Sequence, residues 1–224
     1  DPVPRWGTRQ GYGDETPVVS FDLQSFDQTG VTYFVGAASF AEIDSVSRVP
    51  SFPSNVTDAE WGQRVLNPSD TDDQFQRPLN LLRMQDIQAF VRPLNNRILN
   101  SVIVYIPPES LPPFCDASAR LEEQDESGRY TLEIDVSAFL QKHDDGVNRT
   151  WDQDTGLDLR PLMLIDGQHR TRGGAISPEG KDKRVPIVVL PPEMTLADVA
   201  RIFTEINTGS EELAPLHQLH LRHR

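Results

Sequence analysis

The chain contains 224 residues, with 21 lysine and arginine residues against 34 aspartate and glutamate residues, which gives a formal net charge of −13. This length can bury a substantial core as one large domain. Non-specific DNA binding depends on cations that contact phosphates, so the acidic balance argues against a broad DNA footprint but leaves a local one open. No run of about 18 apolar residues predicts a membrane span. The single cysteine, Cys115, excludes an internal disulfide and a cysteine-rich zinc site, and we therefore expect a cytoplasmic protein.

Hydrophobic patterning divides the first half of the chain into a short arm and several regular elements. Residues 1–16 have no periodicity and predict a flexible arm, after which we expect a single domain over 17–224. The predicted elements are strands at 18–26 and 31–35, a short helix at 39–46, a surface connection at 50–73, a helix at 82–91 and a strand at 101–106. In the surface connection, we interpret Trp61 as an anchor that packs the loop rather than as a platform for a nucleic-acid base.

The helix predicted at 82–91 carries its apolar side chains at helical spacing. Met84, Ile87, Phe90 and Val91 recur on one face, with polar side chains opposite. This pattern predicts that the face containing Phe90 is buried.

The second half of the chain begins with acidic segments and ends with alternating strands and helices. Acidic residues dominate 116–126 and 144–158, which we interpret as solvated loops of an elaboration at 109–158 rather than as metal ligands. The predicted elements are strands at 129–136, 162–165 and 185–190, a helix at 195–206 capped by Thr195, and a last helix that begins at Pro215. This last helix carries three histidines without a carboxylate or cysteine partner, so no metal site is predicted there. Its pattern runs to the final residue, and we expect the native chain to continue past 224.

The strongest local signal is the point where the apolar run Leu162–Ile165 breaks into the sequence Asp166-Gly167-Gln168-His169-Arg170. A helix that begins directly after a glycine turn would point unpaired N–H groups outward, and such groups bind anions. Arg170 would add a forked cationic donor that suits phosphate oxygens and would lie exposed, and His169 would donate to phosphate or titrate near neutral pH. The pattern therefore predicts a phosphate site.

Each of these residues also has a structural interpretation. Asp166 would cap the helix, Gly167 would supply a positive φ, Arg170 would form an ion pair and His169 would pack with hydrogen bonds. The pattern by itself leaves both interpretations open.

The basic residues concentrate after this motif, which makes a local DNA contact a second hypothesis. The candidates are Arg172, Lys181, Lys183 and Arg184.

The pentapeptide Asp166–Arg170 is the signature of the DGQHR-domain proteins, and the chain resembles this family, which includes the DndB-like proteins of DNA phosphorothioation systems. Further segments resemble the same unit: Gln76-Arg77 with Arg83 and Ile87, the strand at 186–190, and the helix end at 201–208 with its F-x-x-I-N spacing. The pair Gly173-Gly174 departs from the pattern, where the helix after the motif would normally continue.

The resemblance implies an α/β fold of the ParB/sulfiredoxin-like superfamily, a mixed sheet with flanking helices and the acidic elaboration at 109–158. In that superfamily the corresponding turn binds a nucleotide phosphate. The implied phosphate or nucleotide ligands are Gly167, Gln168, His169, Arg170, Arg172, Arg77 and Asn207. Two of these keep local alternatives, because Arg77 would also suit a surface salt bridge and Asn207 would also suit a helix C-cap.

The resemblance further implies a DNA-modification or phage-defence protein that binds nucleotide or DNA phosphate, with partners among DNA, nucleotides and other proteins of such systems, and none in the membrane. Asp166 and His169 are the catalytic candidates for a weak metal-dependent NTPase or nuclease reaction, with Asp166 as the metal ligand and Glu205 as a second. ATP or CTP and Mg²⁺ are the implied cofactors. The alternatives are a non-catalytic DNA-binding transcriptional regulator of a DNA sulfur-modification system and a protein-interaction scaffold.

Overall fold

The computed structural model describes residues 18–28, 30–50, 76, 79–93, 95–113, 118–144, 146–154 and 157–208. The predicted arm at 1–16, Trp61, Arg77, Cys115 and the helix after Pro215 lie outside these residues. The chain divides into two compact units, Asp1–Pro50 with Leu79–Glu193, and Ser51–Pro78 with Met194–Arg224. No described helix is long and apolar enough to cross a membrane.

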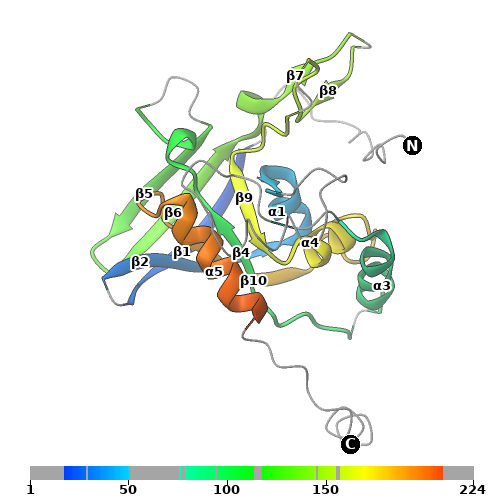
Figure 1. The fold of residues 1–224 in the computed structure, drawn as a ribbon, viewed down its shortest axis with the longest axis horizontal. Helices are drawn as coiled ribbons and strands as arrows, with labels where there is room; N and C mark the ends of the chain where they lie inside the picture. The colour runs from blue at the N-terminus through cyan, green and yellow to red at the C-terminus, as the bar shows by residue number, and fades with distance from the viewer. Residues whose placement is uncertain are drawn as a thin grey trace, which may run out of the picture. The chain divides into compact units, whose positions relative to one another are not determined.

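The first unit is built on one mixed sheet of eight strands in the order β3-β9-β4-β10-β2-β1-β6-β5 (Figure 1). The strands are β1 Val18–Gln28, β2 Val31–Ser39, β3 Ser47–Arg48, β4 Val102–Tyr105, β5 Ala119–Asp125, β6 Arg129–Asp135, β9 Leu162–Asp166 and β10 Arg184–Leu190. The pairs β10–β4 and β3–β9 are parallel, and the other neighbours are antiparallel. The predicted mixed α/β class is therefore confirmed.

The register of the antiparallel strands places one set of apolar side chains on a common face. Phe21 lies opposite Leu132, and Leu23 lies opposite Gly36. Because side chains alternate across a strand, this register points the same set into the main hydrophobic core. Among these strands, sequence alternation predicted β1 and β6, because only one face of each is buried.

Three helices complete the first unit: α1 Phe40–Val46, α3 Leu81–Val91 and α4 Gln168–Ala175. Ser39 and Glu42 form a capping box at the start of α1, since each side chain accepts the backbone N–H of the other residue. Single turns of 3₁₀ helix lie at Pro108–Ser110 and Val136–Phe139.

The two glycines that depart from the family pattern do not end α4, which continues to Ala175. A Cβ atom on Gly173 would lie 2.7 Å from the carbonyl oxygen of Met84, and one on Gly174 would overlap the ring of Phe40. The glycines therefore let α4 approach α3 and α1 closely.

Two predictions about the elements are wrong. Residues 119–125 form strand β5 rather than a solvated loop. This strand lies at the edge of the sheet and is mostly exposed, so its acidic composition hides the alternation. In α3, Phe90 is 45% exposed, whereas Met84 and Val91 are buried. The helix thus has apolar side chains on both its inner and its outer side.

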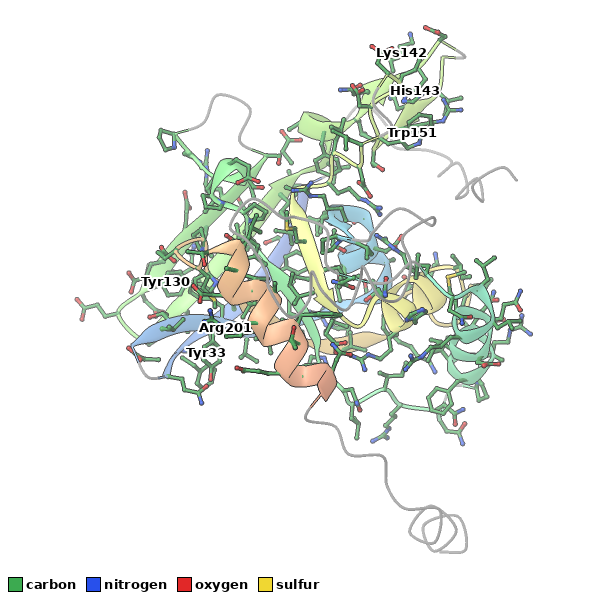
Figure 2. The ribbon with its side chains drawn as sticks, viewed as in Figure 1. Tyr33, Tyr130, Lys142, His143, Trp151 and Arg201 are labelled. Atoms are coloured by element: carbon green, nitrogen blue, oxygen red, sulfur yellow. The ribbon has the colours of Figure 1, made fainter. Side chains whose placement is uncertain are left out.

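The segment at 109–158 contributes β5 and β6 to the main sheet and forms a small separate sheet from β7 Gln141–Lys142 and β8 Asn148–Arg149. Figure 2 shows His143 and Trp151 together on this projecting hairpin. Their rings meet edge to face at 4.2 Å between centroids, and His143 Nε2 lies 2.8 Å from the carbonyl oxygen of Trp151.

In the second unit, the described residues are Gln76, which is buried, and a segment that contains α5, Leu196–Thr208. The predicted cap of this helix is confirmed, because the Thr195 hydroxyl accepts the backbone N–H of Asp198 at 3.2 Å. Val199, Ala200 and Phe203 are buried along one side of α5.

Candidate functional site

The motif lies where β9 ends and α4 begins. Gly167 joins the two elements with a φ of +93°, a conformation that favours glycine. It is also the N-cap of α4, and no side chain caps this helix end. The structural hypothesis that Asp166 caps the helix is therefore wrong, and the hypothesis of a positive φ at Gly167 is confirmed.

Arg170 folds back over the turn instead of extending into solvent. Its Nη2 donates to Asp166 Oδ2 at 2.6 Å and to the Ser101 carbonyl at 2.9 Å. The two side chains of the ion pair are only 22% and 27% exposed. The expectation that Arg170 is an exposed cation is wrong, because the carboxylate of Asp166, at the end of β9, pairs with it and neutralises its charge.

His169 connects the motif to the start of α3. Its Nε2 accepts the backbone N–H of Asn80 at 3.0 Å. Asn80 is the N-cap of α3, and its Oδ1 accepts the backbone N–H of Arg83 at 3.1 Å. Because Nε2 is an acceptor, the imidazole is neutral and carries its hydrogen on Nδ1.

Burial lowers the pKa of His169 below its usual value, and the positive charge of Arg83 lowers it further, against an opposing effect of Asp166. The same geometry explains this direction, since protonation at Nε2 would break the bond from Asn80.

The lowered pKa predicts a pH-dependent loss of stability. In the unfolded chain His169 takes up its proton near pH 6.5, whereas in the folded chain it does so only at lower pH. The unfolded state then binds more protons, so this contribution is fully present above about pH 6.5 and is lost as the pH falls from there through the folded pKa. Urea unfolding at pH 7.5, 6.5 and 5.5 should show that the stability advantage of the parent over His169→Gln shrinks toward pH 5.5. An advantage that is constant with pH would mean that folding does not lower the pKa of His169 and would contradict this prediction.

The N-terminal ends of α3 and α4 therefore meet at His169. Figure 1 shows the two helices as neighbours in the first unit. Each helix N-terminus carries a partial positive charge and N–H groups without partners inside the helix. Arg83 lies in the first turn of α3, is exposed, and forms no ion pair with any described residue. Positive potential thus accumulates at one place on the surface.

Arg83 is missing from the site predicted from the sequence, although it lies within the segment that resembles the family. The sequence nevertheless contains one indication that Arg83 belongs to a site. Asn80 is a typical N-cap, so Arg83 falls in a first helical turn, where the macrodipole disfavours a positive charge. A cation at a position where it destabilises the helix indicates a role outside the helix.

The prediction of Arg172 as a phosphate or DNA contact is wrong. Its side chain is 6% exposed and pairs with the carboxylate of Asp44, while Nη2 donates to the Ser47 carbonyl at 2.8 Å. Arg160 reaches the same place, because its Nη1 donates to the Asp44 carbonyl at 2.7 Å while its Nε contacts Asp158. The two guanidinium groups and two carboxylates form a compact network at the C-terminal end of α1.

The other DNA-contact candidates do not form one exposed basic stripe. Lys183 Nζ donates to the carbonyls of Pro93 and Asn96 at 2.7 and 3.1 Å. Arg184 donates to the Ala37 carbonyl. Lys181 is exposed, with its nearest carboxylate at Asp182, 3.8 Å away. Most of the cationic side chains that cluster in the sequence therefore donate hydrogen bonds within the protein.

The remaining predicted residues belong to different units or are outside the described residues. Gln168 is partly buried in the first turn of α4, and Arg77 is not described. Asn207 belongs to α5 in the second unit, where its side-chain amide donates to the Phe203 carbonyl at 2.7 Å. Glu205 is exposed on the same helix. Among the described residues, no group of three or more His, Cys, Asp or Glu side chains is arranged to hold a metal ion.

No family model, curated protein or solved structure matches this chain.

Proposed function

We propose that the N-terminal ends of α3 and α4 form a binding site for a phosphate group of a nucleotide or of DNA. The observation that carries this proposal is the hydrogen bond from the Asn80 N–H to His169 Nε2, which joins the two helix ends beside Arg83. Two partial positive charges and one exposed guanidinium are thereby directed to the same region of the surface.

The donors around His169 suit a phosphate. The neutral imidazole has its Nδ1–H left as a donor, and the guanidinium of Arg83 offers a planar fork that matches two phosphate oxygens. The carboxylate of Asp166, whose charge acts on His169, is compensated by Arg170 at 2.6 Å. A phosphate bound at His169 would therefore not meet an uncompensated charge from Asp166.

The pentapeptide and its strand–turn–helix setting support the proposal that the chain is a DGQHR-domain, DndB-like protein with a ParB-like fold. On that basis we propose that it acts in DNA modification or phage defence and takes ATP, CTP or DNA as its ligand. A transcriptional regulator of a DNA sulfur-modification system would use the same phosphate site without catalysis.

Binding fits the site better than turnover. His169 Nε2 already accepts a hydrogen bond, and Asp166 Oδ2 already accepts one from Arg170. Efficient phosphoryl transfer needs a metal held by several oxygens and a group that positions the attacking oxygen. Among the described residues, no group of three or more His, Cys, Asp or Glu side chains includes Asp166, so a Mg²⁺ ion brought by a nucleotide would be held mainly by phosphate oxygens and water.

Replacing Arg83 with glutamine tests the site. The measurement is calorimetric titration with phosphate, ATP, CTP or a short DNA duplex in a phosphate-free buffer. We expect the ligand that binds the parent to bind Arg83→Gln about tenfold more weakly. This factor corresponds to the lower end of the 1.5–3 kcal/mol range for a hydrogen bond to a charged group, because Arg83 is exposed.

The matched control is Arg120→Gln, which removes another exposed arginine from the edge strand β5. Its affinity should equal that of the parent. If none of these ligands binds the parent, or if both variants bind as the parent does, the phosphate site is wrong.

A further inference from the structure

Strand β5 forms one end of the eight-stranded sheet, and no described strand pairs with its outer edge (Figure 1). The Asp135 N–H donates to the Ser118 carbonyl at 2.9 Å, which continues the β5–β6 register by one residue. Because backbone groups alternate along an antiparallel strand, every second residue of β5 directs its N–H and C=O groups away from β6. These residues are Ala119, Leu121 and Glu123. Outward groups of this kind are a template for another strand.

The side chains of β5 restrict which strand can pair with this edge. Arg120 and Glu122 lie on one face of the strand with their charged groups 3.6 Å apart, and their side chains are 64% and 55% exposed. Leu121, on the opposite face, packs against the core. Charged side chains normally protect an edge strand, because an arbitrary partner would bring like charges together. The alternating signs in β5 remove this protection for a partner that has the same sequence.

A second copy of β5 pairs favourably in one register. In a twofold antiparallel pair, a residue on the axis lies opposite its own copy. An axis at Leu121 places this side chain opposite the partner's Leu121, and it places Arg120 opposite the partner's Glu122 twice. An axis at Arg120, Glu122 or Glu123 would place a like charge opposite itself, which is destabilising. Of the registers centred on residues 120–123, only the one at Leu121 gives a square of alternating charges.

The backbone of β5 selects the same register. Leu121 is one of the residues whose N–H and C=O groups point outward, so each Leu121 N–H would donate to the carbonyl of the partner's Leu121. Ala119 and Glu123 would exchange hydrogen bonds across the axis in the same way. This is the hydrogen-bonded pair of an antiparallel ladder. The direction of the backbone groups and the order of the charges are independent observations.

We propose that two copies of the chain associate through β5, antiparallel and centred on Leu121, so that their sheets form one continuous sheet across a twofold axis. The net charge of −13 on each chain opposes this association. At physiological salt, however, charges beyond about 8 Å are largely screened, whereas opposite side chains in a sheet have Cβ atoms about 5 Å apart. We therefore expect a weak dimer. The proposal uses only β5 and does not depend on the phosphate site.

Two charge reversals test the register, because each should prevent association while their mixture should restore it. Arg120→Glu makes all four charges at the axis negative, and Glu122→Arg makes all four positive. By sedimentation equilibrium of the full chain, each variant should dimerise at least about tenfold more weakly than the parent, since favourable cross-strand pairs become unfavourable. An equimolar mixture places opposite charges across the axis, so a heterodimer should form with at least the affinity of the parent.

A control and a backbone variant complete the experiment. Asp182→Arg makes the same change in net charge as Glu122→Arg at a side chain that is 79% exposed outside β5, and it should dimerise as the parent does. Glu123→Pro removes one outward N–H and should weaken the dimer, because proline is tolerated on an edge strand only where its nitrogen faces away from the sheet. Thermal unfolding of both reversals should match the parent, because the replaced side chains are exposed.

Several results would overturn the proposal. The parent would have to remain monomeric at a concentration of about 1 mM, where even a millimolar dissociation constant is detectable. Reversals or a Glu123→Pro variant that dimerise as the parent does would assign the association to another surface. A mixture of the two reversals that stays monomeric would contradict the register centred on Leu121.

Discussion

Replacement of Arg172 by alanine is expected to lower the free energy of unfolding by about 3 kcal/mol, the lower end of the range for breaking a buried ion pair. Arg172 is 6% exposed, and it donates to the Asp44 carboxylate and to the carbonyl of Ser47, which is itself buried. Truncation of Arg172 leaves the Ser47 carbonyl without the guanidinium donor. The Asp44 carboxylate then loses its ion-pair partner, and Arg160 remains as the cation bound to the same residue. The lower end applies because the Asp44 side chain is 25% exposed and keeps access to water.

Urea unfolding of Arg172→Ala beside Arg201→Ala measures this effect. Arg201 pairs with Asp198 at 3.0 Å, but 63% of its side chain is exposed. An exposed pair of this kind contributes about 1 kcal/mol or less. Equal, small losses in the two variants would mean that Arg172 is accessible, and the hypothesis that it contacts DNA phosphate would return.

Replacement of Gly174 by alanine is expected to lower the free energy of unfolding by about 2–3 kcal/mol, in the range for overpacking a core. The added Cβ would overlap the ring of Phe40, which is fully buried. Helix propensity acts in the other direction, because alanine stabilises a helix interior by about 1 kcal/mol relative to glycine. The two effects differ in sign, so the experiment separates them clearly.

A double-mutant cycle with Phe40→Leu identifies the cause of the loss. If the clash with Phe40 dominates, Gly174→Ala should cost clearly less in the Phe40→Leu background than in the parent, as measured by urea unfolding. A stabilising Gly174→Ala would show that α4 and α1 do not pack as closely as the structure describes.

The sequence determined the elements whose burial shows in the local pattern, either as one buried face or, in β9, as a continuous buried run. The hairpin of β1 and β2, the capped helix α1, the strands β9 and β10, and the Thr195 cap of α5 were all predictable because local hydrogen bonds and side-chain periodicity act within about ten residues. The positive φ of Gly167 was predictable for the same reason, since a strand that turns directly into a helix requires it.

Periodicity gave wrong predictions of burial or of structure where an element also has an exposed apolar side chain or has almost no apolar side. Phe90 has the spacing of a buried residue, yet only Met84, Ile87 and Val91 face α4 and the core. Strand β5 was hidden for the opposite reason, because an edge strand with acidic side chains has no apolar alternation to detect.

Tertiary structure alone decided which charges remain available. Arg172 is adjacent to the motif in sequence, but its partner Asp44 lies 128 residues away, and their pairing turns a predicted ligand into part of the core. His169 and Asn80 are 89 residues apart, and the packing of α4 on α3, together with their hydrogen bond, brings the ends of the two helices together beside Arg83. The sequence identifies the residue types that bind phosphate, but the partners that neutralise or expose each charge are set by long-range packing, because electrostatic interactions depend on distance in space and on burial rather than on separation along the chain.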